Sequence, residues 1–242
     1  MLVEDKIVEL FKYRKLDKLL KIGHYNMDSP LAKKLIDLQD AIYQLDLYLE
    51  SNWKTSKTKL KTYWKGIHNR LLDLGVPKKE YEDYLKYIHK YQAHELAMRN
   101  GKLPTSMSLS YYYFYKSCDV KLLRRIIYDY IPELSKFWTL ADWRQFDFIT
   151  EINDDIEDLY EDVDVINGNY FLISLKENGV DKTKKLFADY LARMSEEANK
   201  RFDKKASKDQ SQLLKWSNGY GKKTQSLLNS RIKKLDKSIL RD

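Results

Sequence analysis

The sequence contains little cysteine, glycine and proline, and it lacks any long apolar run. The single cysteine, Cys118, excludes an intramolecular disulfide framework and is typical of a reducing compartment. No apolar stretch approaches the roughly 18 residues that a membrane-spanning helix needs, and the charged first residues do not resemble a signal peptide. From these absences we expect a cytoplasmic protein.

Helix-forming residues dominate what is present. Of 242 residues, 43% are hydrophobic and 33% are charged, whereas only 8 are Gly and 4 are Pro. Apolar side chains recur at i, i+3 and i+4, which is the spacing of one buried helix face. The sequence therefore predicts an all-α protein, with helices at about 3–22, 29–51, 55–74, 78–99, 107–130, 139–163, 169–202 and 207–239. Because no Pro-rich or Ser-rich linker interrupts them, we predict a single domain spanning residues 1–242.

The net charge of +8 is concentrated in the C-terminal helical segment, residues 201–242. This segment holds 12 Lys and Arg residues and 4 acids, while the 32 bases and 32 acids of the remaining chain cancel. A basic segment of this kind can contact nucleic acid or anionic lipid, or it can be a solvated helix face. No nucleic-acid-binding motif accompanies it. We therefore expect no nucleic-acid partner and keep peripheral contact with an anionic membrane as an alternative.

A run of acidic residues is the most informative local feature. Between Asp142 and Asp164 the chain carries ten carboxylates and a single base, Arg144. At about 100° per residue, most of these carboxylates fall on one arc of a predicted helix, opposite an apolar arc. Unneutralised carboxylates repel one another and raise each other's pKa, so the acidic arc predicts a bound cation. The alternative is an acidic face exposed to solvent.

The acidic helix offers the oxygen ligands that hard divalent cations prefer. Mg²⁺ is usually held by a few carboxylates together with the phosphates of a substrate. Asp154, Asp158 and Asp162 are spaced i, i+4 and i+8, so a continuous helix would place them in one line. A site with two or three ions needs ligands from a second element. Asp37 and Asp40, spaced i, i+3 on another predicted helix, are the next candidates.

An aromatic run, Tyr111–Tyr115, leads directly into Lys116. Side chains at 111, 114 and 115 share one helix face and could line an apolar channel, with ordinary core packing as the alternative. Lys116 and Arg124 follow this run, and a lysine opposite a metal-loaded acidic face suits an anionic substrate. By itself, such a lysine could equally be a surface residue.

Several common catalytic arrangements are missing from the sequence. The four histidines show no zinc-binding spacing. There is no Ser-His-Asp or Cys-His arrangement, and no Gly-rich phosphate loop of a nucleotide-binding fold.

Four segments covering roughly residues 30–200 carry a family resemblance. Residues 92–96 (Gln-Ala-His-Glu-Leu) are similar to a Gly-Gln-x-x-Asp-Leu segment, and residues 115–117 (Tyr-Lys-Ser) to Tyr-Lys-Thr. Residues 154–158 (Asp-Asp-Ile-Glu-Asp) fit an Asp-Asp-x-x-Asp motif, and residues 164–172 resemble Asp-Leu-x-x-Gly-Lys-x-x-Leu. In this order the segments resemble the class I isoprenoid synthases, most closely the trans-isoprenyl diphosphate synthases.

The chain also departs from that family. The first aspartate-rich motif is degenerate, because Gln39 and Tyr43 stand where the family has Asp. Asn169 replaces the lysine of the last segment, and the paired arginines expected after the first motif are missing. Chain elongation needs two diphosphate sites, so three alternatives stay open. They are a terpene cyclase, a head-to-head synthase of the squalene or phytoene type, and a non-catalytic regulatory subunit.

The resemblance implies a helical bundle around a central apolar cavity and an enzyme that ionises an allylic prenyl diphosphate, with transfer to isopentenyl diphosphate. It implies Mg²⁺ or Mn²⁺ as the cofactor and a homodimer as the assembly. Lys116 and Gln92 would be catalytic, and Lys116 would also bind the diphosphate. The implied metal ligands are Asp154, Asp155, Asp158, Asp162, Asp40 and Asp37, and the implied substrate-binding residues besides Lys116 are Tyr111, Tyr112, Tyr115 and Arg124.

Overall fold

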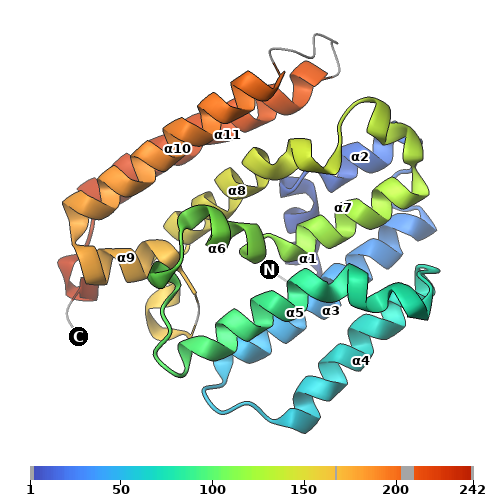
Figure 1. Cartoon of the computed structure of the whole chain (residues 1–242), viewed down its shortest axis with the longest axis horizontal. Helices are drawn as coiled ribbons and strands as arrows, with labels where there is room; N and C mark the ends of the chain where they lie inside the picture. Colours follow the sequence, from blue (N-terminus) through green and yellow to red (C-terminus); the bar gives the residue numbers. More distant parts are fainter. Residues whose placement is uncertain (1–2, 167, 203–209, 241–242) are drawn as a thin grey trace. The chain divides into compact units, whose positions relative to one another are not determined.

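The computed structural model describes residues 3–166, 168–202 and 210–240. All regular secondary structure in these residues is helical and none of it is strand (Figure 1), which confirms the predicted all-α class. No helix among them is both long enough and apolar enough to cross a bilayer. The chain divides into two compact units, Met1–Leu96 with Cys118–Lys136 and Ala97–Ser117 with Phe137–Asp242. The single domain and the central apolar cavity stay predictions.

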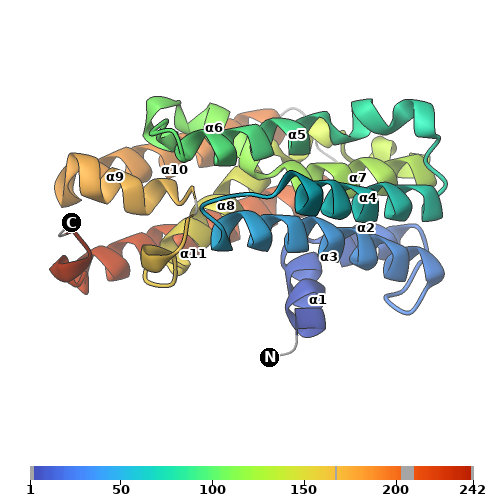
Figure 2. The same cartoon turned by 90° about the horizontal axis from the view of Figure 1, so that it is seen from below.

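The first unit is built from α1 (Val3–Tyr13), α2 (Leu16–Ile22), α3 (Pro30–Ser51), α4 (Lys57–Asp73), most of α5 (Tyr81–Met98) and α7 (Cys118–Tyr130). Helix α3 packs against α1, α4 and α7 (Figure 2). Its start follows from the sequence, because the Ser29 side chain accepts a hydrogen bond from the backbone N–H of Ala32 and Pro30 occupies the first turn. Leu35, Leu38 and Ile42 lie on its buried face.

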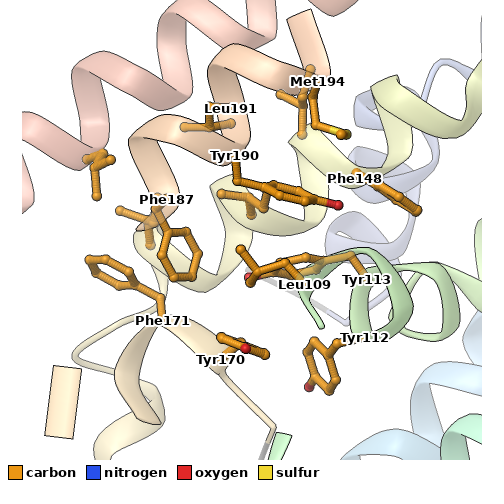
Figure 3. Packing of buried hydrophobic residues seen from close by; sticks show 14 of the residues in the cluster. Leu109, Tyr112, Tyr113, Phe148, Tyr170, Phe171, Phe187, Tyr190, Leu191 and Met194 are labelled. Carbon is orange, nitrogen blue, oxygen red and sulfur yellow. The ribbon is translucent and has the colours of Figure 1, made fainter. Parts of the chain in front are cut away.

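The second unit is built from α6 (Leu109–Lys116), α8 (Arg144–Glu157), α9 (Tyr170–Asn178), α10 (Val180–Phe202) and α11 (Gln210–Lys233). Helix α8 packs against each of the other four, so it is the central helix of this unit. Helices α10 and α11 lie side by side (Figure 1). Aromatic rings from α6, α9 and α10 fill the core beside α8, with Phe171 and Phe187 edge to face at 5.0 Å between ring centroids (Figure 3).

Three of the predicted helices are interrupted. The helix expected at 3–22 breaks at Lys15, which adopts a left-handed backbone with φ of 63°. The helix expected at 169–202 breaks at Gly179, where φ is 76° and glycine avoids the steric cost of a side chain. The helix expected at 107–130 breaks at Ser117, whose hydroxyl donates to the Tyr113 carbonyl at 2.8 Å. Such local side-chain hydrogen bonds compete with helix continuation.

The acidic helix is shorter than predicted. Helix α8 ends at Glu157, and the next residues form a turn followed by a short 3-10 helix, Asp162–Asp164. A helix C-terminus carries partial negative charge, so the carboxylates of Asp158, Glu161 and Asp162 disfavour its continuation. The predicted line of Asp154, Asp158 and Asp162 along one continuous helix is therefore wrong.

Candidate functional site

Helix α8 is buried on nearly all sides, including the side that carries its acids. Its apolar residues Ile149 and Ile152 are fully buried, as expected. The acidic residues Asp147, Glu151 and Asp155 are buried as well. A solvent-exposed acidic face, the alternative considered from sequence, therefore does not describe these three residues. Buried carboxylates need partners, and for two of those in this segment the structure supplies basic partners from distant parts of the chain.

Asp142 lies just before α8 and has a full set of donors. Its carboxylate accepts the Thr139 backbone N–H at 2.6 Å and the Thr139 hydroxyl at 2.9 Å. The Arg201 guanidinium on α10 donates to the other oxygen at 2.5 Å. Burial alone would raise the pKa of Asp142, but the Thr139 backbone N–H and Arg201 lower it below its usual value.

Asp155 lies in the last turns of α8 and is bound from three directions. The Lys116 ammonium at the end of α6 forms an ion pair with it. The Tyr113 hydroxyl donates at 2.7 Å and the Tyr170 backbone N–H donates at 3.0 Å. Burial raises the pKa of Asp155, while Lys116 and then Tyr113 oppose that shift. The same carboxylate holds the pKa of Lys116 well above its usual value, against the opposing effect of burial.

Asn169 connects the end of α8 with the start of α9. Its side-chain N–H group donates to the Asp155 carbonyl and to the Asp162 carboxylate, both at 2.7 Å. Its side-chain oxygen accepts the Leu172 backbone N–H at 2.9 Å and so caps α9. Asn169 is fully buried, and it holds Asp162 near α8 although that helix has ended. Sequence reasoning treated Asn169 only as the replacement of a lysine.

Asp158 sits at the crowded end of the acidic segment. Its backbone N–H closes the last turn of α8 on the Asp154 carbonyl at 2.8 Å. Burial, followed by the charges of Asp154, Asp162 and Glu161, raises the pKa of Asp158 to about 7, and the charge of Lys116 only partly opposes this. At neutral pH a proton and a metal cation would therefore compete for this carboxylate.

Arg231 on α11 was not predicted to have any role at the acidic helix. Its guanidinium donates to the carbonyls of Ile156 at 3.1 Å and Glu157 at 2.7 Å, and it lies over the Tyr160 ring. These carbonyls are unsatisfied at a helix C-terminus, where a cation also complements the helix dipole. Because Arg231 is more than 70 residues away in sequence, no local pattern could have identified this contact.

The acidic segment has the chemistry of a divalent-cation site without its full geometry. All of its ligands would be carboxylate oxygens, which suit Mg²⁺, and the raised pKa of Asp158 indicates negative charge that the surrounding bases do not balance. Within residues 3–166, 168–202 and 210–240, however, no three His, Cys, Asp or Glu side chains are grouped so that they could hold one ion. Asp154, Asp158 and Asp162 would have to move closer together to share a metal.

Four of the predicted site residues belong to the first unit, namely Asp37, Asp40, Gln92 and Arg124. Asp37 is exposed, and Asp40 is half-buried and accepts a hydrogen bond from the Gln44 side chain at 3.1 Å. The side-chain oxygen of Gln92 accepts the Trp64 indole N–H at 2.6 Å. Asp40 and Gln92 therefore have partners in the first unit, whereas the acidic segment belongs to the second.

Arg124, predicted to bind substrate, is almost completely buried within the first unit. Its guanidinium donates to the Arg14 carbonyl at 3.0 Å. This contact gives Arg124 a role in packing α7 against the chain after α1.

The aromatic run divides between the core and the surface. Tyr112 and Tyr113 are buried in the aromatic core of the second unit (Figure 3), and the Tyr112 hydroxyl donates to the Gly168 carbonyl. Tyr111 is 40% exposed and its ring contacts that of Tyr115 at 4.9 Å between centroids. Tyr112 and Tyr113 therefore belong to the core. The three residues predicted to share one face lie nearer the surface, since Tyr111 is exposed and Phe114 and Tyr115 are half-buried.

Comparisons with protein-family models, curated proteins and solved structures find no match for this chain. The resemblance to class I isoprenoid synthases therefore stays a prediction. Any functional proposal depends on the motifs and on the side-chain geometry of the second unit.

Proposed function

We propose that the protein is a Mg²⁺-dependent class I isoprenoid synthase that ionises an allylic prenyl diphosphate and transfers the prenyl group to isopentenyl diphosphate. The observation that supports this proposal is the carboxylate cluster at the end of α8, in which the pKa of Asp158 is raised to about 7. A half-buried cluster with excess negative charge is typical of a site that functions with a bound cation. The cluster also coincides with the segment that resembles the Asp-Asp-x-x-Asp motif.

The acidic segment supplies the proposed metal ligands. Asp154, Asp158 and Asp162 would hold the ion, and bound Mg²⁺ would stabilise negative charge on a diphosphate leaving group. Asn169 has the role of keeping Asp162 beside the end of α8, through its 2.7 Å hydrogen bond to the carboxylate. Asp155 is fully committed to Lys116, Tyr113 and the Tyr170 backbone, so we assign it to support of the site rather than to the metal.

Lys116 has the charge and position to serve an anionic substrate. Its side chain is 19% exposed, so the ammonium is not entirely enclosed by its ion pair with Asp155. Its pKa, held well above the usual value by Asp155 against the effect of burial, keeps it cationic at neutral pH. We propose that Lys116 adds positive charge beside the diphosphate while it remains paired with Asp155.

Turnover assays with Mg²⁺ and prenyl diphosphates of several lengths, with and without isopentenyl diphosphate, test this proposal. Consumption of isopentenyl diphosphate supports elongation, and diphosphate release without it supports a cyclase on the same fold. Asp158→Asn should lower turnover at least 100-fold, since it removes a ligand charge. Asp164→Asn is the matched control, because this exposed carboxylate lies in the same segment outside the cluster. Equal turnover in both variants would contradict the metal assignment.

A non-catalytic relative is the second candidate, and one observation favours it. No described group of three acidic, His or Cys side chains is grouped as a metal site. A regulatory subunit of a prenyl synthase could keep the fold with such an incomplete site. It would show no turnover with any substrate in the assay above, with or without Mg²⁺, and would copurify with a catalytic partner.

A further inference from the structure

Helix α11 carries a one-sided basic face that the proposed function does not use. No Asp or Glu occurs between residues 210 and 235, whereas the same stretch contains Lys215, Lys222, Lys223, Lys233 and Lys234. All five of these lysines are exposed. Lys234 directly follows the last residue of α11. Among the described residues, no ion pair or hydrogen bond involves the ammonium group of any of the five. We call these five side chains the lysine strip.

The lysine strip follows one side of the helix. At about 100° per residue its members fall within an arc of roughly 120°. From Lys215 to Lys233 the strip extends about 27 Å, at 1.5 Å per residue. The residues exposed between the lysines are small or neutral, namely Gly219, Ser226, Asn229 and Ser230. A flat contact along the strip would therefore meet positive charge and no bulky or acidic side chain.

Contacts on the opposite side of α11 fix the orientation of the helix and so the side on which the lysine strip lies. Leu213, Thr224 and Leu228 are fully buried, and the Thr224 hydroxyl forms a 3.1 Å hydrogen bond with the Asn153 side chain on α8. The Trp216 ring packs near Trp143, at 6.2 Å between centroids. The helix therefore cannot rotate its lysines inward without losing its core contacts.

The neighbouring helix α10 shows what an ordinary charged surface looks like in this protein. Its exposed bases are interleaved with acids that pair with them along the helix. Lys185 pairs with Asp189 at 2.6 Å, and Lys200 pairs with Glu196 at 2.6 Å. Such i, i+4 pairs stabilise a solvated helix. Helix α11 has no acid for this purpose, so its unbalanced charge calls for an external anion.

The side-chain types of the strip favour a lipid surface over nucleic acid. The strip contains no arginine for bidentate contacts to bases or phosphates. It also has no aromatic ring on which a base could stack, because Trp216 and Tyr220 contact the aromatic rings of Trp143 and Phe146. Lysines arranged in a plane suit the diffuse negative potential of a bilayer that contains anionic phospholipid.

We propose that the lysine strip of α11 docks the protein on the surface of a bilayer rich in anionic phospholipid. Each lysine near such a surface strengthens binding about fivefold. Because the contact is electrostatic, it weakens as added salt shortens the screening length. The proposal is independent of catalysis and stands whether or not the acidic cluster binds Mg²⁺.

Cosedimentation of the full chain with vesicles tests the proposal. The vesicles contain phosphatidylcholine alone or with about 30% phosphatidylserine, which supplies the anionic surface potential. The strip variant combines Lys215→Gln, Lys222→Gln and Lys223→Gln. Its matched control combines Lys176→Gln, Lys182→Gln and Lys184→Gln, which remove the same charge from exposed sites on α9 and α10. Circular dichroism melting checks that both variants remain folded.

We expect the wild type to bind the anionic vesicles and not the neutral ones. The strip variant should bind them about 100-fold more weakly, and the control should lose much less. The proposal is overturned if both variants lose affinity equally, if neutral vesicles bind as well as anionic ones, or if the wild type binds duplex or single-stranded oligonucleotides but no vesicle.

Discussion

The two ends of α8 shift the pKa values of their carboxylates in opposite directions. Before its N-terminus, Asp142 is buried, yet the Thr139 backbone N–H and Arg201 lower its pKa below the usual value. Past its C-terminus, Asp158 is only half-buried, yet its pKa rises to about 7 because of burial and the neighbouring carboxylates of Asp154, Asp162 and Glu161. Burial alone therefore does not decide the charge state; the identity of the neighbours does.

This difference in the direction of the pKa shift distinguishes carboxylates that stabilise the fold from carboxylates that are candidates for function. A helix N-terminus carries partial positive charge and a C-terminus partial negative charge, so carboxylates at the C-terminal end begin at a disadvantage. At the first end this protein adds Arg201, and at the second it uses Arg231 for the backbone carbonyls of α8. Among the residues that the structure describes, no base forms an ion pair with Asp158. Groups kept in such an environment are the usual candidates for ligand binding.

Breaking the Lys116–Asp155 ion pair gives the largest expected loss of stability, because it leaves a buried charge without its partner. Lys116→Met keeps much of the side-chain volume but leaves the buried Asp155 carboxylate without its counter-ion. We expect a loss of about 3–5 kcal/mol in the free energy of unfolding. In a chain of this length this corresponds to a decrease in Tm of roughly 6–20 °C, measured by calorimetry.

The double variant Lys116→Met with Asp155→Asn is the control. It removes the buried charge together with its partner, so most of the lost stability should return. If the double variant is as unstable as the single one, the ammonium stabilises the fold by packing rather than by balancing Asp155.

Removing the Arg201 charge gives a smaller expected loss of stability, and that loss depends on pH. Arg201→Gln removes a charged donor from Asp142, but the two Thr139 donors remain and the Arg201 side chain is 37% exposed. We expect a loss of about 2 kcal/mol near pH 7. Because the folded pKa of Asp142 is lowered, this contribution is present above the unfolded value of 3.8 and disappears as the pH falls through the folded pKa.

Chemical denaturation of the wild type and of Arg201→Gln at pH 7 and near pH 3 measures that difference. The difference between the two proteins should become smaller at the lower pH, because Asp142 begins to be protonated there. A constant difference at both values would show that Arg201 acts on the fold without involving the charge of Asp142.

The fold could be predicted from sequence wherever its signals were local. Ser29 and Pro30 marked the start of α3, and the apolar spacing identified the helical class. The break at Ser117 was missed, since it depends on the serine hydroxyl bonding the Tyr113 carbonyl instead of extending one long helix. The end of α8 at Glu157 was missed as well, because the apolar spacing continues to Val163 and only the accumulation of acids opposes it.

The acidic residues of the candidate site could be predicted from the sequence, but the residues that contact them could not. The segment from Asp142 to Asp164 was identified from its ten carboxylates. That count suggested that a cation from outside the chain must balance them. In the structure Lys116 and Arg201 form ion pairs with two of these carboxylates, and Arg231 binds the last carbonyls of α8, so part of the compensation is internal. Contacts between residues so distant in sequence leave no periodic signal.

Asp158→Asn gives the smallest expected change in stability, and that change is a gain rather than a loss. It therefore tests most directly whether the two ends of α8 differ. Because the folded pKa of Asp158 is raised to about 7 from 3.8, the wild type binds a proton on folding and loses stability as the pH rises between these values. The neutral amide avoids that loss. After allowance for solvent screening, we expect the variant to be about 1 kcal/mol more stable at pH 8 and equal to the wild type below pH 3.8.

Thermal melting of both proteins at pH 8, with and without Mg²⁺, connects this charge to the proposed function. A bound ion would replace the missing proton, so Mg²⁺ should raise the Tm of the wild type and remove its disadvantage relative to Asp158→Asn. The exposed control Asp164→Asn should respond to Mg²⁺ as the wild type does. If Asp158→Asn is destabilising at pH 8, the carboxylate has a favourable partner there, and the two ends of α8 do not differ in the way described.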